Sequence, residues 1–144
     1  MDDTGVDFSQ LPRGEYAFPG PLRDRLVAAI VAGEKTTTSS LVVEYEQLQL
    51  SLPAVGDREV VVDSAGQPVC ITEVVGVRIC PCAQVSLAHV IGEGEGFATV
   101  EQWRDAHREF WESPDFRTAL GRDDFRLETG TDVVCVEFQV IQHL

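Results

Sequence analysis

Lysine is nearly absent from this chain of 144 residues. Ten of its eleven basic side chains are arginine, and Lys35 is the single lysine. An arginine side chain stays protonated in proteins, whereas a buried lysine can lose its proton and act as a base. The composition is therefore consistent with a site that needs an amine. Random drift at one of eleven basic positions explains the same count, so both interpretations remain open.

Long apolar runs are also lacking. No stretch approaches the roughly 18 apolar residues that a membrane-spanning helix requires. The first ten residues, MDDTGVDFSQ, are acidic and have neither the basic region nor the apolar region of a signal peptide. We therefore expect a cytoplasmic protein with no membrane partner.

Positive charge is scarce as well. Eleven basic side chains face 24 carboxylates, which gives a formal net charge of −13. Strong nonspecific binding to a nucleic-acid backbone relies on cations that release counterions, so this charge argues against it. A local basic cleft or a nucleoside-sized ligand is still compatible with the charge. An acidic surface that keeps the protein soluble explains most of it.

The four cysteines do not form a metal-binding pattern. Cys80 and Cys82 are separated by a single proline, too short a spacing for the usual C-x₂-C zinc motif, and no second pair matches them. Cys70 and Cys135 lie in apolar runs and are typical of small core residues. The cysteines thus predict no metal site, and no cofactor is expected unless the protein is a ribonuclease that uses a divalent cation.

Length and composition indicate one domain over residues 1–144, because 44% hydrophobic residues are enough for a core. Residues 1–14 are expected to be a poorly ordered lead-in. A helix is predicted from Pro21, with Gly33 as its C-terminal cap. A second helix is predicted from Leu41, with Ser39 or Ser40 as its N-cap.

Strands and two more helices are predicted in the rest of the chain. Apolar alternation and turn residues indicate strands over 59–63 and 69–79, which residues 64–66 connect. A short helix over 85–91 precedes the glycine-rich loop, and Thr99 begins a capping box. Residues 113–131 are polar and receive no assignment, and the chain closes on an alternating strand. We predict an α+β fold whose mainly antiparallel sheet curls into a small β-barrel with flanking helices.

Lys35 lies in the segment GEKTTTSS, directly before five hydroxyl side chains. The letters G-E-K-T resemble the end of a phosphate-binding P-loop. That motif fails here because its earlier glycine is missing and because the lysine follows a helix instead of opening one.

Two further segments offer candidate site residues. The loop GEGEG carries Glu93 and Glu95, whose carboxylates can act as a general base, a cation ligand or a partner of Lys35. A solvated acidic loop explains the same spacing. His107 lies four residues after Trp103 and so on the same face of a helix, where packing against the sheet is the simpler explanation.

Five separated motifs of this chain occur in the order found in ASCH domains. They are G-x-K-T-x-T and S-x-L-x-x-E-Y-E within residues 33–46, V-x-D-x-x-G-x-P-V-C-I over 61–71, E-G-E-G over 93–96, and W-R-x-x-H-x-x-F/W over 103–111. Over roughly residues 18–141 the chain resembles the stand-alone bacterial proteins of this class. One departure is that Ser39 and Ser40 follow Thr38, where many ASCH domains have T-x-R. An arginine that can bind a phosphate is therefore missing at this place, which weakens the expectation of polymeric RNA as the ligand.

The resemblance implies a PUA-like barrel, a scaffold associated with RNA recognition. Some small ASCH-like proteins hydrolyse the N4-acyl group of acetylated cytidine with a lysine, a threonine three positions later and a downstream glutamate; others resemble ribonucleases. By motif, the resemblance assigns catalysis to Lys35, Thr38 and Glu93, with Glu95 as the alternative glutamate. The residues expected to bind substrate are Glu95, Ser40, Thr37, Trp103 and His107.

Three functions follow as hypotheses. In the first, Lys35 in a dry cleft has its pKa lowered from about 10.4 toward about 7–8 and activates Thr38 for attack on an amide. In the second, the protein is a single-strand ribonuclease whose carboxylates recruit a divalent cation. In the third, it is a binding module without chemistry. The expected partner is a nucleoside or single-stranded RNA, and the oligomeric state, monomer or homodimer, stays open.

Overall fold

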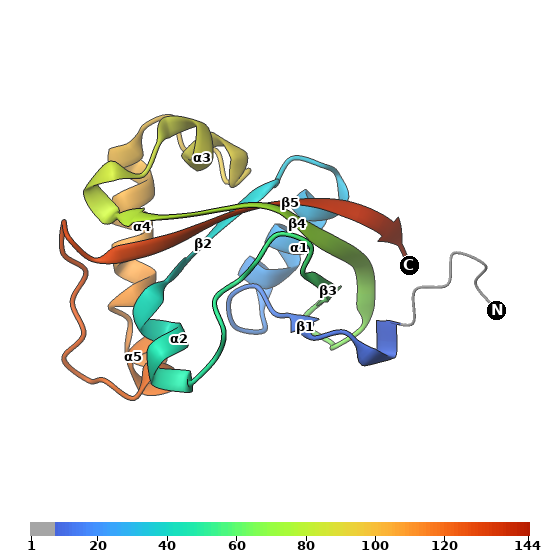
Figure 1. Cartoon of the computed structure of the whole chain (residues 1–144), viewed down its shortest axis with the longest axis horizontal. Helices are drawn as coiled ribbons and strands as arrows, with labels where there is room; N and C mark the ends of the chain where they lie inside the picture. Colours follow the sequence, from blue (N-terminus) through green and yellow to red (C-terminus); the bar gives the residue numbers. More distant parts are fainter. Residues whose placement is uncertain (1–7) are drawn as a thin grey trace.

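The computed structural model describes residues 8–144 and contains a sheet of five strands in the order β1-β3-β4-β5-β2 (Figure 1). β1 runs parallel to β3, and the other neighbouring strands are antiparallel. This confirms the mainly antiparallel α+β fold. Strand pairing within residues 8–144 leaves the sheet open, so it is barrel-like without being a closed barrel. The strands are β1 (Arg13–Gly14), β2 (Thr37–Leu41), β3 (Arg58–Val62), β4 (Pro68–Pro81) and β5 (Asp132–His143).

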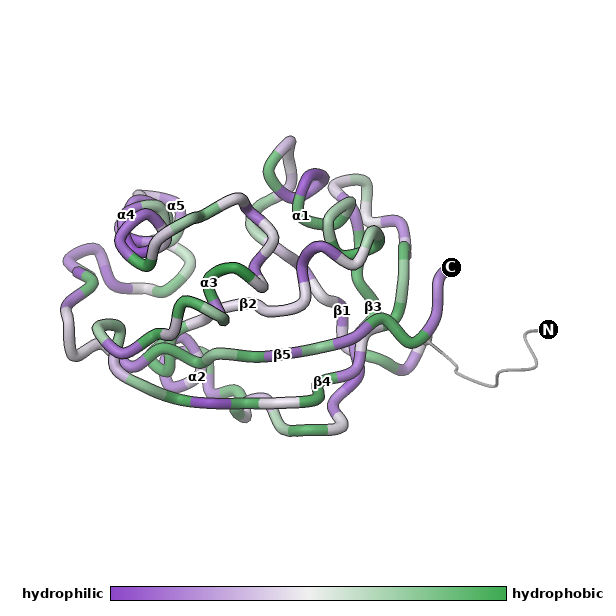
Figure 2. The backbone as a smooth tube through the Cα atoms, turned by 90° about the horizontal axis from the view of Figure 1, so that it is seen from above, coloured by the Kyte–Doolittle hydropathy of each residue, from purple (hydrophilic) through white to green (hydrophobic). Residues whose placement is uncertain are grey.

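The curvature of the sheet comes from its two longest strands. β4 and β5 run side by side and change repeatedly between apolar and polar residues (Figure 2). Their register shifts between Ile71 and Thr72 and again between Val74 and Gly76, and β3 and β4 shift between Val61 and Val62. Such bulges bend a strand and increase its twist. The sheet therefore wraps partly around its own core.

Two hydrophobic clusters cover opposite faces of β5. Phe138 belongs to the cluster under α1, together with Val27 and Ile30. Val133 and Cys135 belong to a larger cluster that contains Trp103 of α4. Because successive strand residues point to opposite faces, odd and even positions of β5 serve different clusters. All four cysteines are buried free thiols, as the sequence predicted for Cys70 and Cys135.

Most predicted helices are confirmed. Pro21 begins the first helix, and Gly33, with a φ of +79°, lies just beyond its end. Thr99 caps α4 by accepting a hydrogen bond from the backbone N–H of Gln102 at 3.1 Å. None of the helices within residues 8–144 is long and apolar enough to span a membrane. The helices are α1 (Pro21–Val31), α2 (Val42–Leu48), α3 (Leu87–Gly92), α4 (Val100–Trp111) and α5 (Pro114–Leu120), with short 3₁₀ turns at Phe8–Gln10 and Cys82–Gln84.

Two local predictions need correction, and one segment without a prediction gains an assignment. Ser39 and Ser40 do not cap α2: they pair with β5 inside β2, and the Glu44 carboxylate caps the N–H of Leu41 instead. Part of the expected lead-in is ordered, because residues 8–14 contain a 3₁₀ turn and β1, while residues 1–7 lie outside the described part. The unassigned segment 113–131 contains α5, which Ser113 caps.

Candidate functional site

Lys35 is a buried lysine at the junction between α1 and β2. The chain turns after α1, and the backbone N–H of Lys35 donates to the carbonyl of Ala29 at 3.1 Å. The residue is only 3% exposed. Its Nζ donates to the carbonyl of Thr37 at 2.8 Å and to that of Glu93 at 3.3 Å. The fold therefore buries the amine and satisfies it mainly with neutral carbonyl groups.

This environment changes the acidity of Lys35. Burial is the largest influence and lowers the pKa below its ordinary value of 10.5, while the carboxylates of Glu93 and Glu95 oppose the change. The ring of Tyr16 lies 6.0 Å from Nζ and covers it from another side. Lys35 thus holds more neutral amine at a given pH than a solvated lysine does, which is the state a general base needs.

The Glu93 carboxylate makes several polar contacts with neighbouring side chains. The residue is only 1% exposed. Burial alone raises the pKa of this group. Hydrogen bonds from His107 and His89 and the charge of Lys35 outweigh burial and hold the pKa below its ordinary range. Glu93 is therefore an anion inside the protein. Its contacts are Trp103 Nε1 at 2.7 Å, Ser39 Oγ at 2.5 Å and His89 Nε2 at 3.3 Å, all to Oε2, and His107 Nε2 at 3.1 Å to Oε1.

His107 links Glu93 to the backbone of α4. Its Nδ1 lies 2.9 Å from the carbonyl of Trp103, and its ring stacks on the Trp103 indole at 4.6 Å between centroids. Nδ1 and Nε2 therefore each lie within hydrogen-bonding distance of an oxygen atom, the Trp103 carbonyl and Glu93 Oε1 respectively. Trp103 itself is 0% exposed. It was predicted to bind substrate, but the indole lies in the core and donates its N–H to the Glu93 carboxylate.

Glu95 lies at the rim of the same site. The residue is exposed, but neighbouring atoms desolvate its carboxyl group, and this raises the pKa; the charge of Lys35 opposes the rise and that of Glu93 adds to it. One ligand atom from each of Glu93, Glu95 and His107 lies within 4.8 Å of the others, an arrangement that can hold a metal ion. The trio combines carboxylate and imidazole donors, which suit Mn²⁺ or Zn²⁺.

The glycines of the GEGEG loop allow its backbone to approach Lys35 closely. The N–H of Thr36 donates to the carbonyl of Gly92 at 2.7 Å. Gly94 has a φ of +69°, and a Cβ at this position would lie 2.6 Å from the carbonyl oxygen of Glu34. The loop therefore lies directly on the segment before β2, and this contact brings Glu93 to Lys35.

The hydroxyls of β2 divide between the two faces of the strand. Thr37 donates to the carbonyl of His89 at 2.7 Å, and Ser39 contacts Glu93, so both face α3. Thr38 and Ser40 alternate with them and point to the other face. Ser40 Oγ lies 2.7 Å from the hydroxyl of Tyr45.

Among the predicted site residues, the structure brings Lys35, Glu93, Glu95 and His107 together. It places Thr38 across the strand from the Glu93 carboxylate.

Thr38 nevertheless shares its face with residues that approach Lys35. It pairs with Val136, two positions before Phe138 on β5. The Phe138 ring packs on Tyr16 at 6.3 Å, and Tyr16 lies close to Lys35 Nζ. Thr38 is half-buried, and its hydroxyl makes no hydrogen bond to another residue in the described part of the chain. The Thr38 hydroxyl therefore has no hydrogen-bond partner in the described part of the chain, and it lies on the same face of the sheet as Phe138.

Ser39 and His89 are site residues that the sequence analysis missed. Ser39 Oγ lies 2.7 Å from His89 Nε2 as well as contacting Glu93. One signal was present: His89 and Glu93 are four residues apart, the spacing that puts two side chains on one helix face. For Ser39, the signal was its strand alternation with Thr37.

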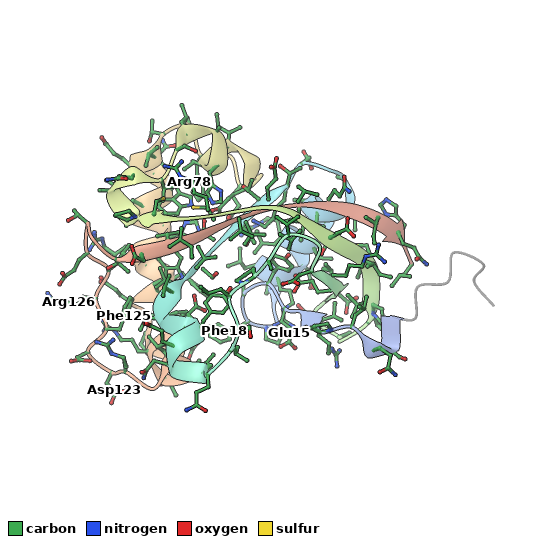
Figure 3. The ribbon with its side chains drawn as sticks, viewed as in Figure 1. Glu15, Phe18, Arg78, Asp123, Phe125 and Arg126 are labelled. Carbon is green, nitrogen blue, oxygen red and sulfur yellow. The ribbon has the colours of Figure 1, made fainter. Side chains whose placement is uncertain are left out.

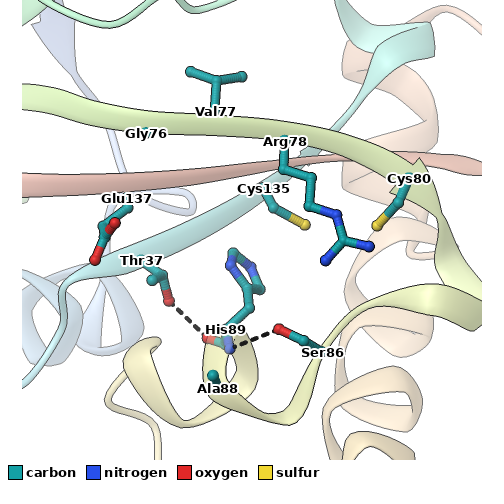
Figure 4. Close-up of a pocket in the computed structure, with 10 residues that line it drawn as sticks. All are labelled: Thr37, Gly76, Val77, Arg78, Cys80, Ser86, Ala88, His89, Cys135 and Glu137. Carbon is teal, nitrogen blue, oxygen red and sulfur yellow. Dashed lines mark hydrogen bonds between the residues drawn. The ribbon is translucent and has the colours of Figure 1, made fainter.

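A cavity of about 350 Å³ opens beside His89. Thr37 and Glu137 lie at one side of the His89 ring and Arg78 at the other, as Figure 4 shows. Arg78 projects from β4 near α3 and lies above Arg126 in the view of Figure 3. His89 thus separates this cavity from the Glu93 carboxylate.

Comparisons with known proteins agree with this architecture. The family model of the ASCH domain matches residues 15–142. An ASCH domain from Lactobacillus crispatus is 28% identical, with a TM-score of 0.80 over 94% of this chain and 82% of that one. A DUF984 protein from Enterococcus faecalis is 23% identical, with a TM-score of 0.79 over 92% of this chain and 77% of that one.

A search of curated proteins found no match. The family match spans nearly the whole described part of the chain, and the PUA-like fold that it brings is an RNA-binding fold. The chain belongs to the ASCH domain family.

Proposed function

We propose that this protein hydrolyses the amide bond of a nucleoside whose cytosine-type base carries an acyl group on N4. The observation that supports this most is the buried amine of Lys35. Burial lowers the pKa of this amine, and Glu93 and Glu95 lie near it. Amide hydrolysis at neutral pH needs a base for the attacking group and an acid for the leaving amine. The site contains a candidate for each.

Lys35 acts as the base and Thr38 as the nucleophile in this proposal. The neutral Lys35 amine takes the proton of the Thr38 hydroxyl while the oxygen attacks the acyl carbonyl. The C–N bond then breaks, the N4 amine leaves with a proton, and water hydrolyses the threonine ester. Thr38 suits this role because its hydroxyl makes no hydrogen bond within residues 8–144 and lies on the face that Tyr16 and Phe138 share.

Glu95 is the better candidate for the acid. Its pKa is raised, so it retains a proton to a higher pH than an ordinary glutamate, and it lies at the accessible rim. Both oxygens of Glu93 already accept hydrogen bonds from protein groups. Glu93 therefore acts as a positioning residue. Its hydrogen bonds fix the loop, and its negative charge acts on the Lys35 amine.

Incubation with N4-acetylcytidine tests the proposal. We expect the wild-type protein to release cytidine and acetate, and Lys35→Arg to lose at least about a hundredfold of this rate, the lower range for general-base catalysis. Arg25→Lys, an exposed position on α1, is the matched control and retains the rate. No release by the wild type, or an unchanged rate in Lys35→Arg, contradicts the proposal.

A divalent-cation-dependent ribonuclease is the second candidate function, and the trio Glu93, Glu95 and His107 favours it. A bound cation there would polarise a phosphate oxygen or acidify a water molecule. The Nδ1 contact of His107 with a backbone carbonyl is the supporting interaction that metal-binding histidines usually have. Degradation of labelled single-stranded RNA that stops with a chelator supports this function, and inertness toward RNA with and without chelator removes it.

A further inference from the structure

We propose that the cavity beside His89 binds the phosphate group of a nucleotide through Arg78. For this purpose the Arg78 pocket is defined by Arg78, His89, Ser86, Thr37 and Glu137, with Gly76, Val77, Cys80, Ala88 and Cys135 completing its wall. Its volume of about 350 Å³ lies in the range of about 300–1,000 Å³ that is usual for small-molecule sites. This pocket is distinct from the proposed nucleophile of amide hydrolysis, because it lies on the α3 face of β2 and Thr38 points to the other face.

Arg78 is an available guanidinium. It makes no hydrogen bond and no ion pair with any residue of the described range 8–144, whereas Arg58 pairs with Glu73 and Arg108 with Glu112. Its side chain reaches from β4 into the pocket (Figure 4). A free guanidinium is the usual partner of phosphate because its planar N–H groups match two phosphate oxygens.

Neighbouring groups extend this anion site. Ser86 accepts a hydrogen bond from the N–H of His89, so its own hydroxyl proton remains free to be donated. Its side chain lines the same pocket as Arg78, on the Arg78 side of the His89 ring (Figure 4). A phosphate in this corner thus meets a cation and a hydroxyl donor.

The far side of the pocket has the opposite preference. Glu137 lies there beyond the His89 ring, and its carboxylate repels a second anion while it accepts hydrogen bonds from hydroxyl or amino groups (Figure 4). A nucleoside monophosphate has this polarity, with phosphate at one end and hydroxyl and amino groups at the other. A cavity elsewhere on the molecule differs, because its Arg122 and Arg126 are accompanied by three carboxylates, Glu46, Glu128 and Asp132.

Binding measurements with cytidine 5′-monophosphate, cytidine and inorganic phosphate test the proposal. None of these probes carries an acyl group, so the result does not depend on hydrolysis. We expect the monophosphate to bind about tenfold or more tightly than either cytidine or phosphate alone, as one or two charge-assisted hydrogen bonds imply. In Arg78→Gln this advantage over cytidine disappears, while Arg25→Gln, which removes the same charge from an exposed site on α1, retains it.

Backbone amide NMR shifts locate the ligand. Shifts concentrated at Ser86–His89 and Arg78 support the proposal, and shifts confined to the Arg122–Asp132 region overturn it. Three affinity results also overturn it: equal affinities for monophosphate and cytidine, an advantage of the monophosphate that survives Arg78→Gln, and no monophosphate binding at millimolar concentration.

A 5′-phosphorylated oligonucleotide distinguishes the source of the phosphate. Binding as tight as that of the monophosphate indicates RNA ends, and weaker binding indicates free nucleotides.

Discussion

The indole of Trp103 donates a hydrogen bond to the Glu93 carboxylate at 2.7 Å, and both side chains are almost completely buried. A carboxylate that is removed from water needs such donors, since an unpaired buried charge is strongly destabilising. Trp103 Nε1, Ser39 Oγ and His107 Nε2 together supply them. The polar cluster around Glu93 is thus a structural unit as well as the wall of the candidate site.

Loss of the indole donor is expected to destabilise the protein. Trp103→Phe retains much of the apolar contact and removes the hydrogen bond to a charged group, which contributes about 1.5–3 kcal/mol. Trp111→Phe, also buried and in the same cluster, is the matched control for packing. Urea unfolding should show the larger loss for Trp103→Phe, and equal losses contradict the role given to Nε1.

Glu93→Gln is expected to reduce the free energy of unfolding by about 3–5 kcal/mol near pH 7, because it breaks a buried charged network. The pKa of Glu93 is lowered in the folded protein, so its stabilising contribution is present above the ordinary carboxylate pKa of 4.5 and is lost as the pH falls below it. The difference in stability between wild type and variant should therefore shrink from pH 6 to pH 3. Urea titrations across this range measure it, and a constant difference contradicts an ionised Glu93.

Lys35 has the opposite pH dependence. Because its pKa is lowered in the folded state, the folded protein binds fewer protons than the unfolded chain. The free-energy cost of burying the charged amine is therefore largest at low pH. That cost disappears as the pH rises from the folded-state pKa toward the ordinary value of 10.5. Relative to Lys35→Met, the wild type should gain stability between pH 7 and pH 10. If the difference in the free energy of unfolding between wild type and Lys35→Met stays constant or decreases over this range, the amine is not desolvated.

The close approach of the GEGEG loop to Glu34 is tested by two alanine substitutions. Gly94 and Gly96 both have positive φ angles, +69° and +85°, but only at Gly94 would a Cβ meet another residue within 4 Å. We expect Gly96→Ala to cost about 1 kcal/mol and Gly94→Ala about 1–3 kcal/mol more, together with most of the hydrolytic activity. Thermal unfolding and the acetylcytidine assay measure both effects. Indistinguishable variants would show that the loop does not depend on this contact.

Much of the fold follows from local patterns in the sequence. Pro21, Gly33 and Thr99 mark helix ends by chemistry that acts over a few residues, and the structure confirms all three. The hydroxyl run was harder, because Ser39 and Ser40 suit a helix cap as well as a strand. Backbone pairing with β5, nearly a hundred residues later, decided for the strand.

The candidate site was predictable only in part. Lys35 was conspicuous as the single lysine, and motif order pointed to Glu93 or Glu95. Arg78 carried no motif, and its availability depends on which carboxylates the folded chain places near it. The same holds for His89, whose contact with Ser39 joins α3 to β2 across fifty residues. Such pairings arise from tertiary packing, which no local pattern encodes.

The buried amine of Lys35 gives up its proton more easily than a lysine in water. Because Lys35 is the only lysine, protein labelled with ¹³C-lysine gives a single side-chain ε-carbon signal from the chain. Following that signal by NMR from pH 6 to pH 11 measures the pKa of Lys35 directly. We predict a midpoint clearly below 10.5, with a further decrease in Glu95→Gln, because the Glu95 carboxylate raises this pKa. A midpoint at or above 10.5 in the wild-type protein would contradict the account.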